Sequence, residues 1–195
     1  MKTNILKSAL VLVVAASVAS FTSISERKVN VKESQVNWKG YKVTGQHEGT
    51  INLKEGSLTF TDNQLTGGNF VIDMTTINST DVSGGTKDKL DGHLKSDDFF
   101  GVEKFPTASL KITKVSGKDK SYKVTGDLTI KGITNSTTFD LKIVDDQTAT
   151  AALKIDRSKF DVRYGSTSFF DDLKDKAIYD EFDLNVTLKY QGSPK

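Results

Sequence analysis

Two pairs of adjacent aspartates are the residues in this sequence best suited to acid–base chemistry. They are Asp97-Asp98 and Asp171-Asp172, and neighbouring carboxyl groups can serve as acid and base when a buried setting drives their pKa values apart. Ser96 precedes the first pair and predicts a helix N-cap, with both aspartates beside the positive end of the helix dipole. Carboxylates in such positions usually complement the dipole or face water. We therefore expect neither pair to be catalytic.

The two histidines are the next candidates, because imidazole is a common metal ligand. His47 precedes Glu48, and His93 lies two residues after Asp91. A zinc site needs three or four such ligands at recognisable spacings, and the chain contains no cysteine. The sequence therefore predicts no metal site and no cofactor.

Motifs of the common enzyme classes are also missing from the sequence. It contains neither the G-x-S-x-G motif of a nucleophile elbow nor the H-E-x-x-H motif of a zinc protease. The stretch Gly84-Gly85-Thr86-Lys87 lacks the rest of a phosphate-binding loop. We expect a binding protein and not an enzyme.

Most of the chain alternates apolar and polar residues, which is the pattern of half-buried β-strands. The alternation is cleanest at 182–190, and Lys54-Glu55-Gly56 and Asp62-Asn63 are among the predicted turns. About eight such strands favour an all-β fold closed into an antiparallel barrel, because an open sheet would expose its edges. An eight-stranded barrel can pack its own side chains or enclose one slender ligand.

Two stretches, 78–106 and 156–179, interrupt this alternation. In the first, leucines at positions 90 and 94 lie four residues apart and predict a short helix after the break at Ser83-Gly84-Gly85. The pairs Phe99-Phe100 and Phe169-Phe170 lie in these irregular stretches and not on alternating strand positions. We expect short helical lid segments over one end of the barrel, with both pairs lining the entrance to an apolar cavity.

The inward positions of the strands supply the other candidate ligand-binding residues, although a filled core would account for many of them. They are Trp38, Phe70, Ile72, Met74, Leu110, Ile112, Leu128, Ile130, Phe139, Leu141, Phe182 and Leu184. Four basic residues could meet a polar head group, although solvation at the surface is the simpler role for each: Lys42, Lys87, Lys95 and Arg157.

The beginning of the chain has the features of a secretory signal peptide. Lys2 and Lys7 precede an apolar run that is too short to span a bilayer, and small residues follow. We expect residues 1–19 to be removed, 20–35 to form a polar link and 36–191 to form the barrel of an exported protein, periplasmic or secreted, without stable membrane insertion. Outside the leader the basic and acidic residues balance, which gives no support for nucleic acid as a partner.

Three sequence blocks resemble the YceI-like, polyisoprenoid-binding family of exported bacterial proteins. They are KLDGHLKSDDFFGVEKFPT at 89–107, VTGDLTIKGIT at 124–134 and IDRSKFDV at 155–162. The resemblance implies a lipocalin-like barrel that holds a long isoprenoid chain, of a polyprenyl phosphate or quinone type, and it allows a homodimer. Two alternatives stay open: an envelope stress or structural protein with a filled barrel that binds a protein partner, and a hydrolase acting on a lipid-like substrate.

Overall fold

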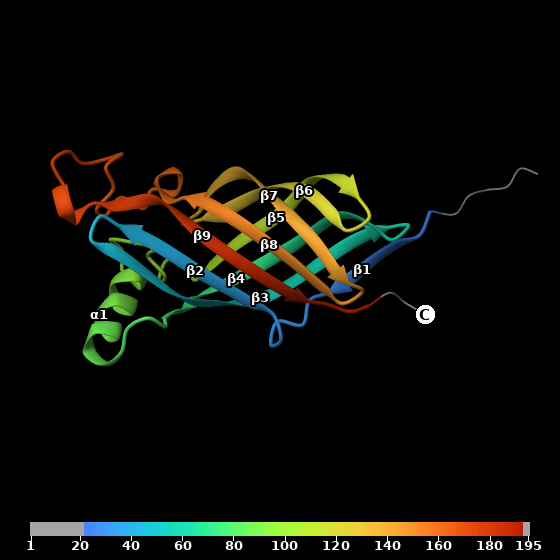
Figure 1. Cartoon of the computed structure of the whole chain (residues 1–195), viewed down its shortest axis with the longest axis horizontal. Helices are drawn as coiled ribbons and strands as arrows, with labels where there is room; N and C mark the ends of the chain where they lie inside the picture. Colours follow the sequence, from blue (N-terminus) through green and yellow to red (C-terminus); the bar gives the residue numbers. More distant parts are fainter. Residues whose placement is uncertain (1–21, 193–195) are drawn as a thin grey trace, which may run out of the picture.

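The computed structural model describes residues 22–192, and in this part of the chain nine strands and one α-helix account for most of the structure (Figure 1). In chain order the elements are β1 (Ile24–Lys28), β2 (Gln35–Lys42), β3 (Gly45–Thr61), β4 (Gln64–Ser79), α1 (Gly84–Lys95), β5 (Thr107–Lys118), β6 (Ser121–Ile130), β7 (Ile133–Asp145), β8 (Thr148–Asp156), the 3-10 turns η1 (Arg157–Phe160) and η2 (Lys174–Lys176), and β9 (Ile178–Lys189). The predicted signal peptide, residues 1–19, lies outside the described residues.

Strands β2 to β9 form the closed eight-stranded antiparallel barrel that the alternation predicts. Each of these strands pairs with the next strand in sequence, including β4 with β5 across the intervening α1, and the pairing of β2 with β9 closes the circle. At the closure Trp38 lies opposite Leu184, which brings two inward-facing apolar side chains together. Every barrel strand therefore has a hydrogen-bonded neighbour on both sides, which removes the exposed edges of an open sheet.

The predicted turn at Lys54-Glu55-Gly56 is wrong, because β3 runs through it without a break. The pairing of β3 with β4 shifts register between Leu53 and Glu55, so the strand absorbs these residues as a β-bulge. Gly56 allows the close approach there, since a Cβ atom on it would lie 2.8 Å from the Phe70 ring. The predicted turn at Asp62-Asn63 is confirmed, and both residues have positive φ.

One end of the barrel, called here the plug end, is closed by β1, which lies within the predicted polar link. The strand pairs with the second half of β3 and carries Arg27, which is only 4% exposed. Its guanidinium lies 4.0 Å from the centre of the Phe60 ring and donates to Asp146 and Asn63. Phe60 in turn stacks on Tyr190. The sequence gives little sign of this strand because Ile24 is its only large apolar residue.

The opposite end, called here the lid end, is covered by α1 and by the irregular stretches 96–106 and 157–177 (Figure 1). The helix predicted around Leu90 and Leu94 is confirmed, but the helix expected to start at Ser96 is wrong. Ser96 ends α1, and both its backbone N–H and its hydroxyl donate to the carbonyl of His93. Residues 97–105 form turns, in which Gly101 has a φ of 58°.

The core of the barrel fills its plug-end half. Leu58, Val124, Leu141 and Ala149 are at most 2% exposed there, and Tyr122 is also buried. The hydroxyl of Tyr122 donates to the side chain of Gln64 and the carbonyl of Asp119. Because this half packs its own side chains, any ligand space must lie toward the lid end.

Candidate ligand cavity

An apolar cavity of about 140 Å³ lies in the lid-end half of the barrel, and its exposed lining is entirely nonpolar. The lining residues come from strands β2 to β6 and β9, from α1 and from the stretches that follow α1 and β8. They are Val36, Trp38, Gly40, Ile51, Ile72, Met74, Ile77, Leu94, Phe99, Phe100, Ala108, Leu128, Ile130, Arg157, Ile178, Tyr179, Phe182 and Leu184.

A second apolar pocket of about 90 Å³ adjoins the main cavity and shares several of its lining residues, including Trp38, Leu94 and Phe99. It continues between α1 and the lid-end tips of β2 and β3, toward the side chains of Lys42 and His47. Together the two spaces form an apolar path from the middle of the barrel to a basic rim.

His93, on α1, lines this second pocket and is held between two aromatic rings. Its ring centre lies 4.4 Å from that of Tyr164 and 5.6 Å from that of Phe99, both edge to face. The Nε2 atom is buried and has no hydrogen-bond partner among the described residues. It is therefore a buried polar atom beside the apolar path whose hydrogen-bonding capacity is not used by the described residues.

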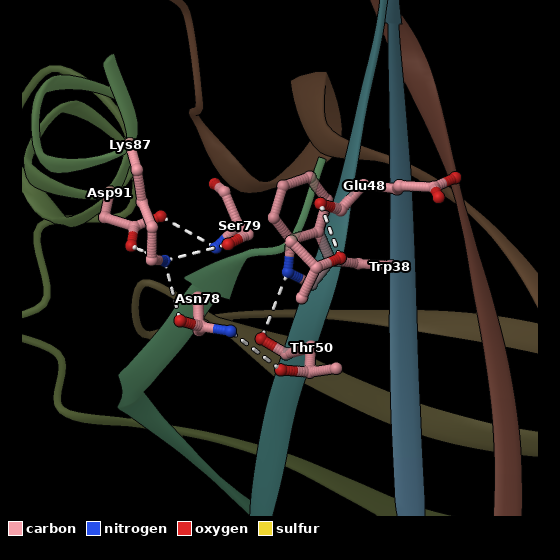
Figure 2. A network of polar contacts seen from close by, with 8 residues as sticks. Trp38, Glu48, Thr50, Asn78, Ser79, Lys87 and Asp91 are labelled. Carbon is pink, nitrogen blue, oxygen red and sulfur yellow. Dashed lines mark hydrogen bonds and ion pairs between the residues drawn. The ribbon is translucent and has the colours of Figure 1, made fainter. Parts of the chain in front are cut away.

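Helix α1 has no buried residue, and a polar cluster attaches it to the barrel (Figure 2). The Nζ atom of Lys87 donates to Asp91 at 2.6 Å, to the Asn78 side chain at 2.7 Å and to the Ser79 carbonyl at 2.8 Å. Asp91 accepts a further hydrogen bond from the Ser79 backbone N–H. These contacts, called here the latch, hold the middle of α1 against the end of β4.

The latch also determines the charge state of Asp91. Burial alone would raise the pKa of its carboxyl group, but hydrogen bonds from Lys87 and Ser79 outweigh that effect and hold the pKa below its ordinary value. The carboxylate of Asp91 is therefore charged near neutral pH, where it pairs with Lys87. This pair is partly buried, so it is less screened than a pair on an open surface.

Trp38 connects the latch to the cavity wall. Its indole N–H donates to the Thr50 carbonyl at 3.2 Å, and the Thr50 hydroxyl accepts from the Asn78 amide (Figure 2). The ring lies against Gly49, where a Cβ atom would come within 2.6 Å of the indole and 2.1 Å of the Asn78 carbonyl. Gly49 is therefore the residue that lets Trp38 lie flat against β3.

Among the described residues, Arg157 is the only charged side chain in the cavity lining, and it is 2% exposed. Its guanidinium donates to the carbonyls of Val162, Ile178 and Tyr179 and lies 3.4 Å from Asp180. Burial lowers the pKa of this guanidinium from its ordinary value, but arginine still remains charged. These contacts tie together the stretch after β8 and leave Arg157 with a structural role in place of the head-group contact considered from the sequence.

The structure brings nine of the sixteen candidate residues together around the main cavity. These are Trp38, Ile72, Met74, Phe99, Phe100, Leu128, Ile130, Phe182 and Leu184. Phe99 is buried and its ring packs edge to face on Phe100, which in turn contacts Phe182. This Phe-Phe pair therefore forms part of the cavity wall beneath the lid.

Seven candidates lie elsewhere. Five of them pack in the barrel core outside the cavity lining: Phe70, Leu110, Ile112, Phe139 and Leu141. Phe169 and Phe170 do not line the cavity, since they are 39% and 49% exposed on the stretch between β8 and β9. A tight turn, in which both of their backbone N–H groups donate to the Ser166 carbonyl, holds them at the surface.

Sequence reasoning missed half of the cavity lining. Val36, Ile51 and Ile77 occupy strand positions that alternation alone could have identified. Ala108 precedes Leu110 and Ile112 on the same strand face, so alternation could have identified it as well. Gly40, Leu94, Ile178 and Tyr179 line the cavity because of how the lid end closes, and no local sequence pattern identifies them. Of the basic candidates, Lys42 lines the outer part of the apolar path and Lys87 belongs to the latch. Lys95 lines a separate surface pocket.

The residues considered for catalysis and metal binding have simpler roles here. Asp97 pairs with Lys104 at the surface, and His47 Nδ1 lies 2.8 Å from Asp81. Asp171 and Asp172 are exposed. In the part of the chain that the structure describes, no three acidic or histidine side chains cluster as metal ligands.

These features define a class of protein, namely a closed eight-stranded antiparallel barrel with an apolar cavity beneath a lid. The family model of the YceI-like domain matches residues 28–190. The chain therefore belongs to the YceI-like family, as its three sequence blocks predict. Within residues 22–192 no helix has the length and apolarity needed to cross a membrane.

Relatives and solved structures agree with this assignment. The UPF0312 protein PA0423 of Pseudomonas aeruginosa is 34% identical over 96 residues, which cover 49% of this chain and 48% of that protein. The chain thus spans about half the length of that relative. The Burkholderia cenocepacia BcnA structure has a TM-score of 0.66 at 21% identity, covering 82% of this chain and 98% of BcnA. A polyisoprenoid binding domain from Saccharophagus degradans has a TM-score of 0.59 at 14% identity, covering 86% and 98%.

Proposed function

We propose that this protein binds the hydrocarbon chain of an isoprenoid lipid in its cavity and carries or sequesters that lipid without covalent chemistry. The apolar cavity beneath the lid is the observation that carries the proposal. The fold relative from Saccharophagus degradans is described as a polyisoprenoid binding domain, which supports this choice of ligand. If residues 1–19 direct export as proposed, the protein would work in the periplasm or outside the cell.

The size of the cavity determines how such a ligand would bind. A five-carbon isoprene unit occupies roughly 150 Å³ if each carbon takes about the volume of one water molecule in the liquid. The cavity of about 140 Å³ therefore accommodates about one unit with the lid closed. A longer chain has to displace Leu94 and Phe99, which line both spaces, and extend along the adjoining apolar path, which requires α1 to loosen from the barrel.

The head group would then lie at the basic rim. The path ends near Lys42 and His47, and the Nε2 atom of His93 lies along it without a hydrogen-bond partner among the residues described. A phosphate or a quinone carbonyl at this place would stay partly in water and meet one cation. A wet head group is required, because burying it in the apolar cavity without partners would cost several kcal/mol.

Mass spectrometry of organic extracts tests the proposal directly. The full chain is purified from its native host without detergent, in parallel with the Ala108→Leu variant, in which added carbons project into the cavity. We expect a near-stoichiometric species with an isoprene-built side chain in the wild-type extract and much less of it in the variant extract. Equal amounts in both extracts, or phospholipid alone, would contradict the proposal and favour a filled barrel that acts through its outer surface.

A further inference from the structure

An exposed aromatic surface surrounds part of the cavity mouth. Tyr164, Phe169, Phe170 and Tyr179 are between 39% and 55% exposed, and Val43 is 52% exposed. The backbone N–H of Val43 donates to the Ala177 carbonyl, so the β2–β3 turn lies beside the stretch that carries the aromatic residues. This set of five residues, called here the mouth patch, lies at the lid end of the barrel.

The mouth patch is continuous with the cavity. Tyr179 belongs to the patch and also lines the main cavity, and the Tyr164 ring packs on His93 of α1. A molecule covering the patch would therefore contact both the opening of the cavity and the lid. That position is suited to a partner from which the ligand is taken or to which it is given.

Next to the patch lies another concave site, which is distinct from the two apolar spaces and is lined by charged residues. It has a volume of about 510 Å³ and is walled on the apolar side by Tyr164 and Phe170. Its charged lining residues carry both signs and are Asp97, Asp98, Lys131, Asp161, Arg163 and Lys176. Lys176 and Asp98 form no ion pair with another described residue.

The charges in this site are complementary to a zwitterionic head group. Lysine and arginine side chains can donate to a phosphate, while aspartates and the faces of Tyr164 and Phe170 can receive an ammonium group. The stretch 163–176 itself carries three basic and three acidic residues, so it has no net charge to attract an anionic surface. Tyrosine is enriched where a bilayer meets water, and exposed phenylalanine can bury its ring at the boundary with the acyl chains.

We propose that the mouth patch and the adjacent charged site bind the surface of a bilayer rich in zwitterionic phospholipid, and that this contact seats the cavity mouth on the membrane. The proposal rests on the proposed function, because an isoprenoid chain resides in bilayers and its exposure to water costs about 0.8 kcal/mol per CH₂. Contact with the membrane would let the chain pass between bilayer and cavity without crossing water.

Flotation with phosphatidylcholine vesicles tests the contact. The test variant is F169S/F170S, whose side chains do not line the cavity, and the matched control is I24S/V144S, which removes exposed apolar side chains at the plug end. We expect the wild type and the control to float with the vesicles. The partition coefficient of the test variant should be about tenfold lower. Adding phosphatidylglycerol should change wild-type binding little. Equal flotation of both variants, or binding only with phosphatidylglycerol, overturns the proposal.

A transfer assay separates this proposal from the proposed function. A fluorescent polyprenol probe is moved between vesicles, and its retention by the protein is measured separately without vesicles. We expect the wild-type transfer rate to rise with acceptor vesicle concentration, and F169S/F170S to lose that dependence while retaining the probe. Flotation without probe retention would contradict only the proposed function. A dimer in sedimentation that F169S/F170S abolishes, with no flotation, would overturn the membrane contact in favour of a second copy of this chain.

Discussion

The substitution Ala108→Leu should stabilise the protein and weaken its ligand binding at the same time. Ala108 is 6% exposed and lines the cavity of about 140 Å³, so three added carbons have space on the cavity side. Each takes roughly the volume of a water molecule, about 30 Å³, so together they fill more than half of the cavity. At about 0.8 kcal/mol per buried CH₂, the gain in unfolding free energy is at most about 2.4 kcal/mol.

The same carbons occupy the space that the ligand chain would use. A ligand that loses three buried methylene contacts loses about 2.4 kcal/mol, which corresponds to roughly a fiftyfold weaker Kd. Urea unfolding measures the first effect, and titration with a fluorescent polyprenol probe measures the second. Opposite signs for stability and binding are the expected signature of a cavity that is kept for a ligand.

Ala149→Leu is the matched control, because it makes the same chemical change in the filled half. Ala149 is fully buried and is not part of the cavity lining, so overpacking should cost about 1–3 kcal/mol there. Probe titration of this variant should give a Kd close to that of the wild type. The reasoning fails if Ala108→Leu destabilises the protein as much as Ala149→Leu does, or if it leaves the probe affinity unchanged.

Three further predictions concern the lid. Lys87→Met removes three hydrogen bonds of the latch, and because this lysine is partly exposed we expect α1 to open only about tenfold more often. Stopped-flow measurement of probe release should show faster release from this variant, whereas the control Lys89→Met, at an exposed position of α1, should release the probe at the wild-type rate. Gly49→Ala should lower the unfolding free energy measured in urea by about 3 kcal/mol, because its Cβ would overlap Trp38 and the Asn78 carbonyl. The Cβ of Gly92→Ala meets no atom within 4 Å, so this variant should strengthen α1 and slow probe release. An equal loss of stability in both variants would contradict this reasoning. The pKa of Asp91 is lower in the folded state than in the unfolded state, so its contribution to lid docking is complete above the unfolded pKa and is lost as pH falls through the folded pKa. Probe release should therefore accelerate below about pH 4. Asp91→Asn should remove this pH dependence.

The barrel could be predicted from local sequence because its cause is local. Inward residues along a single strand, such as Phe182 and Leu184 on β9, alternate with outward ones, and each strand shows its buried face without reference to the others. The error at Lys54-Glu55-Gly56 has the opposite cause. A charged pair followed by glycine resembles a turn, and only pairing with β4 makes it a bulge within a longer strand.

The candidate site could be predicted only in part, because the cavity depends on which inward residues leave space between them. Leu110 and Leu128 lie opposite each other on neighbouring strands, yet only Leu128 lines the cavity. Arg157 and Gly49 show a second limit. Their roles depend on carbonyls and a ring supplied by distant segments, and a charged residue or a glycine alone gives no sign of such contacts.

The plug end has a consequence for the direction of ligand movement. Arg27, Phe60 and Tyr190 close that end of the barrel, and the filled half behind them leaves the lid end as the side on which the described cavity opens. If the protein carries a lipid as proposed, a chain that enters tail first would leave head first through the same opening, so the barrel would act as a pocket and not as a conduit. Loading and unloading would then be the forward and reverse directions of one equilibrium. The protein itself would impose no direction, and net delivery would follow the difference in the lipid's chemical potential between donor and acceptor.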